Sequence, residues 1–212
     1  MINTNSFGFL GQFYFGLKNN FKKIYQNSNF YEKKISKTFD NYFQYKPSPH
    51  LLSSIIKYQN KKYRIEDFAV ESIWQNKISR KDYEKLNNFF WFFSLDLKSS
   101  KETTQSVIKN WVNKNDKYNK DSWEFDLTAK RIIAWLSNHQ LTYQDSDKKY
   151  RLMFDHMIQK QTNHLLSEIR SSNTLENKLI GCSAIILAGL AYKSEKNYLE
   201  SGLGILKNII KS

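Results

Sequence analysis

Hydrophobic residues recur along most of the chain at intervals of three and four, which is the spacing of one face of an α-helix. A first clear helix is predicted from Ser79, whose hydroxyl can form a capping box with Asp82, to about Leu97. The same spacing predicts later helices at residues 101–113, 121–139, 146–170, 174–191 and 195–211. With only 2 Pro and 7 Gly, the chain also lacks the turn residues that an all-β fold needs. We therefore expect an all-α protein built from successive antiparallel hairpins.

The N-terminal part of the chain is less regular. Two polar stretches, 42–50 with both prolines and 113–122, are predicted to be linkers. The apolar stretch 7–17 is shorter than the roughly 20 residues that span a bilayer, and it lacks the basic start and the cleavage site of a signal peptide. It predicts an N-terminal helix, either amphipathic or buried. A helix at a membrane surface stays open as a further reading, because three lysines follow: Lys18, Lys22 and Lys23.

The helix expected at 174–191 differs from the others. Residues 179–191 read LIGCSAIILAGLA, which is apolar almost all round, so we expect this helix to be buried on most faces. Gly181 and Gly189 would allow neighbouring helices to approach closely. Only one helix, at 195–211, is predicted after it, and this helix alone would cover little of its apolar surface. We therefore expect either that the chain is cut or that it needs another chain.

The segment WEFDLTAKRIIAWLSN (123–138) carries two distinct helical faces. One is apolar, formed by Phe125, Ala129, Ile132 and Leu136. The other runs through Glu124, Thr128, Arg131 and Trp135, and continues to Asn138 and His139. A tryptophan beside an arginine can stack on a sugar ring and pair with its carboxylate or sulfate. The competing interpretation, which spacing alone favours, places Trp135 in the core and pairs Arg131 with Glu124 or Asp126.

The net charge of +13 indicates an acidic partner, either nucleic acid, an anionic membrane or an anionic polysaccharide. However, only 5 of the 33 cationic residues are Arg, and an AT-rich coding sequence would produce such a lysine bias without a binding site. Cys182 lies in an apolar run and is expected to be a small core residue. The 4 His have no metal-ligand spacing, so we expect neither a metal nor a cofactor.

The pattern W-E-x5-K-R-I-x-x-W-L at 123–136 resembles the N-terminal helical toroid of the heparinase II/III-like polysaccharide lyases. The runs at 85–97 and 161–192, and Trp111 between them, resemble neighbouring parts of that toroid. The resemblance covers residues 70–212, which would form an incomplete α/α-toroid domain. Residues 1–69 form a poorly defined helical segment before it. The β-sandwich domain of the family would be absent.

This resemblance implies β-elimination on a uronic-acid polysaccharide. A basic or amide side chain neutralises the substrate carboxylate, a Tyr or His removes the adjacent proton, and an acid protonates the leaving oxygen. No metal or other cofactor is required. The family also suggests a periplasmic or envelope location. The family's tyrosine and its other histidine have no match in this chain, so we expect the fragment alone to be inactive, with the missing C-terminal region as its partner.

Site residues follow from the resemblance position by position. Asn177 matches the asparagine that neutralises the carboxylate, although a capping role in the first helical turn is the alternative. The next residue in many relatives is His and is Lys178 here, which can bind a carboxylate but is a poor base. The expected substrate-binding residues are Trp123, Glu124, Arg131, Trp135, His139 and Lys178. We expect Arg131, Trp135 and Asn177 to line one concave groove.

The alternative function is a non-enzymatic basic helical module that binds an anionic polymer, either polysaccharide or nucleic acid. No helix-turn-helix, RRM or KH pattern is recognisable, so nucleic acid is not the expected partner.

Overall fold

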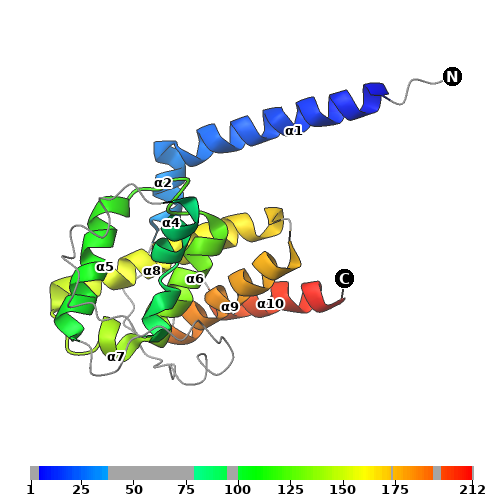
Figure 1. Ribbon diagram of the computed structural model, residues 1–212. Helices are drawn as coiled ribbons and strands as arrows, with labels where there is room; N and C mark the ends of the chain where they lie inside the picture. The colour runs from blue at the N-terminus through cyan, green and yellow to red at the C-terminus, as the bar shows by residue number, and fades with distance from the viewer. Residues whose placement is uncertain (1–4, 38–78, 95–99, 173, 193–196, 212) are drawn as a thin grey trace.

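The computed structural model describes residues 5–37, 79–94, 100–172, 174–192 and 197–211, and the regular elements in these ranges are all helical. The all-α prediction is therefore confirmed. The α-helices are α1 (Asn5–Gln26), α2 (Asn29–Ile35), α4 (Arg80–Asn87), α5 (Lys101–Asn115), α6 (Phe125–Ser137), α7 (His139–Thr142), α8 (Lys148–Glu168), α9 (Leu175–Ala191) and α10 (Tyr198–Lys211) (Figure 1). Two short 3-10 helices complete the set, η3 (Phe90–Ser94) and η4 (Ile169–Ser171).

Most helices begin where a short polar side chain caps the first turn. Ser79, Ser100, Asp147 and Thr174 each accept a hydrogen bond from the backbone N–H three residues later, which satisfies a donor that the helix cannot use. The predicted starts of α4, α5, α8 and α9 agree with these caps to within two residues. Helices α6 and α7 differ, because their N-caps Glu124 and Asn138 make no such bond. Helix α6 also starts later than expected.

The helix predicted to run from Ser79 to Leu97 is interrupted in the structure. Helix α4 ends at Asn87, and Phe89 takes a left-handed conformation with φ of 58°. The Asn88 side chain accepts a hydrogen bond from Phe90 N at 2.9 Å and starts η3. The left-handed turn lets the fully buried Phe89 ring pack edge-on against Trp135 at 5.2 Å between ring centroids. Helical spacing alone could not reveal this break; residues 95–97 lie outside the described ranges.

Helix α6 lies at the centre of the core. It runs antiparallel to α8, since the Trp123 carbonyl faces His164 near one end while the Thr142 carbonyl faces Tyr150 near the other. Helix α9 packs across α6 and α8, and α10 forms an antiparallel hairpin with α9 (Figure 1). At the start of the chain, α2 packs on α8 through its buried Tyr31 and Ile35. The predicted domain boundary at residues 69/70 lies outside the described ranges and stays a prediction.

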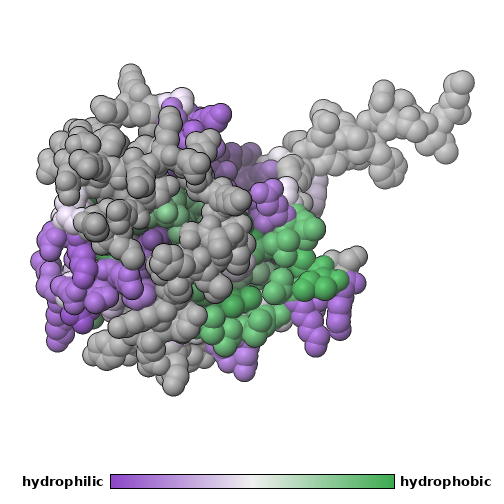
Figure 2. Space-filling model, turned by 60° about the horizontal axis from the view of Figure 1, so that its bottom comes forward, coloured by the Kyte–Doolittle hydropathy of each residue, from purple (hydrophilic) through white to green (hydrophobic). Residues whose placement is uncertain are grey.

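Helix α9 is less enclosed than the sequence suggested. Its buried side holds small residues, among them Cys182 and Ala188, and confirms the core position of the cysteine. Leu179 and Leu190, on the other side, remain exposed among the described residues. Figure 2 shows apolar residues gathered over this part of the molecule. The expectation of burial on most faces is thus wrong for α9 in this structure, because α6, α8 and α10 cover one side of it.

Helix α1 extends away from the other helices as a long arm (Figure 1). Tyr14, Phe21 and Ile24 are each about 70% exposed along it, so the helix is not buried from Tyr14 onward. The side chains of residues 7–13 lie outside the described ones, and for them both predictions stay open. None of the helices in the described ranges is both long and apolar enough to cross a membrane.

Two glycines give a matched test of the α9–α10 hairpin. A Cβ on Gly189 would lie 2.4 Å from Leu199 N, whereas a Cβ on Gly204 would meet nothing within 4 Å. We expect Gly189→Ala to cost about 1–3 kcal/mol of unfolding free energy, because the α10 backbone must move away. Gly204→Ala should instead stabilise the protein by about 0.5–1 kcal/mol, because alanine restricts the unfolded chain and favours helix. Urea unfolding of both variants measures this, and equal effects would contradict the close contact.

Candidate functional site

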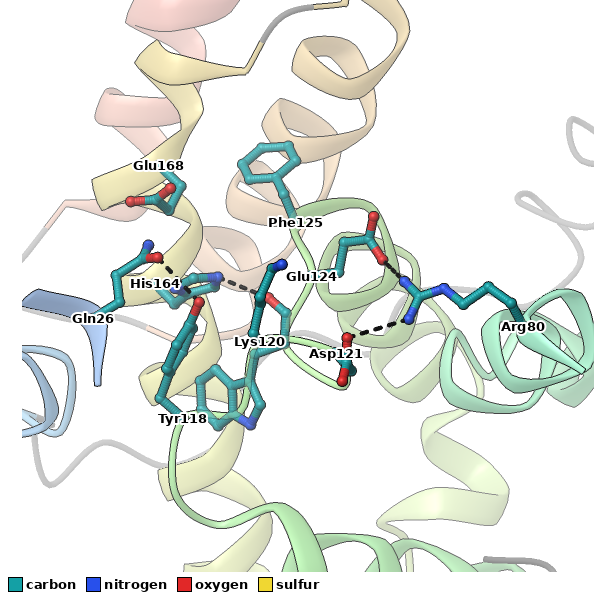
Figure 3. A pocket seen from close by; sticks show the side chains of 10 residues that line it. Gln26, Arg80, Tyr118, Lys120, Asp121, Glu124, Phe125, His164 and Glu168 are labelled. Atoms are coloured by element: carbon teal, nitrogen blue, oxygen red, sulfur yellow. Dashed lines mark hydrogen bonds and ion pairs between the residues drawn. The ribbon is translucent and has the colours of Figure 1, made fainter. Parts of the chain in front are cut away.

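A cleft of about 360 Å³ opens where the end of α1, the start of α4, the loop before α6 and the end of α8 meet (Figure 3). These four segments are far apart in the sequence. The lining residues are Gln26, Arg80, Tyr118, Lys120, Asp121, Trp123, Glu124, Phe125, His164 and Glu168. Two of the predicted substrate-binding residues, Trp123 and Glu124, belong to this cleft.

The loop at 116–124 shapes one wall of the cleft. Asn119 holds the loop in a turn, because its Oδ1 accepts hydrogen bonds from Asp121 N at 2.9 Å and Ser122 N at 3.2 Å. The Trp123 indole N–H donates to the Asn115 carbonyl at 2.9 Å, which ties the loop to the end of α5. Trp123 is 1% exposed, so it forms the wall and has little face left for a sugar ring. Lys120 stays exposed at the rim.

Arg80 organises the charges on one side of the cleft. Its guanidinium pairs with Glu84 at 2.7 Å, with Asp121 at 3.4 Å and with Glu124. The side chains of Arg80, Glu84 and Glu124 are about half exposed and that of Asp121 is 67% exposed, so each pair adds little to stability and can exchange for a ligand. Partial burial raises the pKa of Glu124, although Arg80 opposes that shift. A carboxylate of a ligand could therefore form an ion pair with Arg80 beside these acidic side chains.

His164 forms the floor of the cleft and is fixed on both sides. Its Nε2 lies 2.9 Å from the Trp123 carbonyl, which can only accept, so Nε2 carries the proton. Its Nδ1 then accepts the hydrogen bond of the Tyr31 hydroxyl at 2.7 Å. Burial lowers the pKa of His164 to about 4. The imidazole is therefore neutral at neutral pH and has no nitrogen left for substrate.

A buried ion pair supports the cleft from behind. Lys160, 2% exposed, binds Glu32 of α2 and lies 3.7 Å from the Asp116 carboxylate. Its ammonium also lies 5.6 Å from the centre of the Trp123 ring. Tyr118 joins this group, because its backbone N–H donates to Glu32 and its hydroxyl donates to Gln26. These contacts connect the loop to the N-terminal helices and position the cleft wall.

The predicted sugar-binding face of α6 is buried. Arg131 and Trp135 are both 0% exposed, so neither can contact a ligand here, and the expected groove with Asn177 is not formed. The Arg131 guanidinium stacks on Trp111, 3.9 Å from the ring centre. The acceptors of its hydrogen bonds are all neutral, at 2.8–3.2 Å: the Asn87 and Ser122 carbonyls, Gln161 Oε1 and Thr128 Oγ1.

The alternative ion pair of Arg131 is also wrong, because Glu124 pairs with Arg80 and Asp126 pairs with Lys130 at 2.7 Å. Other helices cover α6 on both of its sides, so the polar side chains on the second side form their hydrogen bonds within the protein. The spacing argument identified the two faces correctly but could not say that the second one meets other helices.

The remaining predicted residues lie apart from the cleft lining. His139, 6% exposed, opens α7. Asn177 and Lys178 lie in the first turns of α9, both partly exposed. The Asn177 backbone N–H donates to Thr174 Oγ1 at 3.1 Å, as a capped first turn requires. The structure leaves the catalytic role of Asn177 as a prediction.

Sequence reasoning missed Arg80, Tyr118 and Lys120. Arg80 directly follows the recognised cap Ser79, and a rare arginine in a lysine-rich chain was the available signal. Tyr118 and Lys120 lay in a stretch that was predicted to be a plain linker. That stretch becomes a cleft wall only because α1 and α8 pack beside it.

Within the described ranges, no group of three or more His, Cys, Asp or Glu side chains is arranged to hold a metal ion. Comparison of the chain with protein families, with curated proteins and with solved structures finds no match.

Proposed function

We propose that the chain is the N-terminal helical part of a heparinase II/III-like lyase, and that the cleft bounded by Arg80, Lys120 and Glu124 binds its acidic polysaccharide. The observation that carries the proposal is the segment at 123–136. It resembles that family in sequence, and its first two residues, Trp123 and Glu124, line the cleft. In this proposal the antiparallel helices α6, α8, α9 and α10 are part of an incomplete α/α toroid.

The chemistry of the cleft suits a uronate chain. Arg80 would bind a uronate carboxylate in exchange for one of its exposed partners Asp121 and Glu124, and Lys120 at the rim adds a second cation. The third carboxylate of the lining, Glu168, is paired with Lys22. Tyr118 and Phe125 supply aromatic surface for sugar rings, while Asp121 and Glu124 can accept hydrogen bonds from hydroxyl groups. Its volume lies within the range of small-ligand sites.

Neither the histidine nor the tyrosine of the cleft can act as the base for β-elimination. His164 is neutral but has both nitrogens engaged. Burial raises the pKa of Tyr118 to about 12, so its hydroxyl holds its proton at neutral pH. Asn177 would neutralise the substrate carboxylate, as the resemblance implies, from the first turn of α9. That turn precedes Gly181, which packs against Phe125 at the edge of the cleft. We therefore propose that this chain binds the polymer without turnover.

Binding should depend on Lys120. We expect Lys120→Gln to weaken binding of an acidic oligouronate by about tenfold, the loss of one charge-assisted contact. The matched control is Lys148→Gln, since Lys148 is also exposed and lies at the other end of α8 from the cleft. Isothermal titration calorimetry with the oligouronate and with a neutral oligosaccharide measures both. Equal binding by the two variants would place the polymer elsewhere.

Turnover is tested separately by the absorbance of the unsaturated uronate product. We expect none from this chain at any concentration that saturates binding. Product formation by this chain would contradict the claim that the base lies outside it.

The alternative, a non-enzymatic basic module, has one observation in its favour: Arg131 and Trp135, the two strongest chemical candidates of α6, are buried. It predicts that binding follows polymer charge alone, so a sulfated polymer and a nucleic acid would bind as well as a uronate of equal charge.

A further inference from the structure

The apolar stripe of α1 is a surface that the cleft does not explain. Tyr14, Leu17, Phe21 and Ile24 follow one another at intervals of three, four and three residues, so they share one face of the helix. Their side chains are 70%, 42%, 69% and 69% exposed. Exposed large apolar residues gathered on one face mark an interaction surface.

The same surface continues around the turn into α2. Phe30 is 72% exposed, and its ring centre lies 6.4 Å from that of Tyr25 at the end of α1. Lys34 of α2 lies over the Tyr25 ring at 5.9 Å. The arm and its base therefore present aromatic rings and basic side chains together.

Charge determines which partner fits this surface. Helix α1 contains three lysines and neither Asp nor Glu. Lys22 contacts the other helices, because its ammonium binds Glu168 of α8 and Ser171 of η4. Lys18 and Lys23 are exposed, with no ion pair to any acid in the described part of the chain. A helical protein partner would favour aliphatic residues and charges of both signs beside the stripe.

We propose that α1 is an interfacial helix that lies on an anionic lipid surface, with its apolar stripe in the headgroup region and its lysines toward acidic headgroups. An amphipathic helix with an apolar stripe of aromatic and aliphatic residues and lysines on the rest of its surface has this property. In α1, Lys18 borders the stripe, because it is four residues from Tyr14 and three from Phe21, and Lys23 lies opposite. Figure 1 shows α1 clear of the other helices over most of its length, which leaves its stripe open to a flat surface. This surface is separate from the cleft and its proposed polysaccharide.

The test is co-sedimentation of the whole chain with phosphatidylcholine vesicles, with and without phosphatidylserine. We expect binding only when phosphatidylserine is present. Phe21→Gln with Ile24→Gln should weaken it at least about tenfold, and Lys18→Gln about fivefold. The matched control is Ile210→Gln on α10, equally exposed at 75%, which should bind as the parent protein does.

Three outcomes would overturn the proposal. The first two are full vesicle binding by the Phe21/Ile24 double variant and equal binding of the parent to neutral vesicles. The third is self-association that the double variant abolishes, without any vesicle binding by the parent, which would assign the stripe to a second copy of the chain. Because all these positions are exposed, circular dichroism should show the same helix content in each variant.

Discussion

Arg131→Ala should lower the free energy of unfolding by roughly 4 kcal/mol. The guanidinium is fully buried, and its loss leaves two carbonyl groups and the Gln161 side chain without their donor. Burial without any paired carboxylate lowers the pKa of Arg131 to about 9, yet the group remains charged at neutral pH. Arg131→Lys should also be costly, because one ammonium cannot reach acceptors spread around a planar fork.

Urea unfolding at neutral pH measures both variants. Arg170, exposed in η4, provides the matched control, and Arg170→Ala should change stability by less than about 0.5 kcal/mol. A loss below about 1 kcal/mol for Arg131→Ala would contradict the central, structural role that the hydrogen bonds assign to this residue.

His164 should make stability depend on pH in a defined window. Its folded pKa of about 4 lies below its ordinary value of 6.5, because burial disfavours the charged ring. The contribution of the neutral His164 to the free energy of unfolding is therefore complete above pH 6.5 and is lost as the pH falls toward 4. Between these two limits the free energy of unfolding falls by about 3 kcal/mol. We expect the stability difference between the parent and His164→Gln to shrink by about this amount between pH 7 and pH 4.

The comparison with a variant is necessary because a second buried group acts in the opposite direction. Burial raises the pKa of Asp155 to about 6, although Tyr143 and Tyr192 donate hydrogen bonds to it. The stability from its protonated form is present below pH 3.8 and is lost as the pH rises to about 6. Asp155→Asn should therefore expose the acid sensitivity of His164. A constant difference between parent and His164→Gln would refute the buried neutral imidazole.

Local features were predictable from the sequence, and long-range ones were not. The Ser79 cap acts on the next turn of its own chain and was recognised in the sequence, whereas helical spacing located the helices that Ser100 and Thr174 cap in the structure. The break at Phe89 depends on aromatic rings of α5 and α6, which no local pattern shows. The all-helical class follows from the spacing of hydrophobic residues in the sequence, whereas the left-handed turn at Phe89 follows from tertiary packing.

The candidate site shows the same division. Trp123 and Glu124 were expected to face substrate and do line the cleft. Arg131 and Trp135 share a helical face with Glu124, but α6 passes into the core after its first turn, and these two residues lie inside. Arg80 reaches the cleft only because α4 folds back beside the loop before α6, which joins residues 44 positions apart.

The indole N–H signals of the protein test the central claim most directly. Trp123 lines the cleft, while Trp111 of α5 and Trp135 of α6 contact each other in the core. In a ¹H–¹⁵N spectrum titrated with an acidic oligouronate, we expect the Trp123 signal to shift saturably and the other two to stay in place. Shifts of Trp111 and Trp135 without Trp123, or no shift at any concentration, would contradict a polysaccharide site in this cleft.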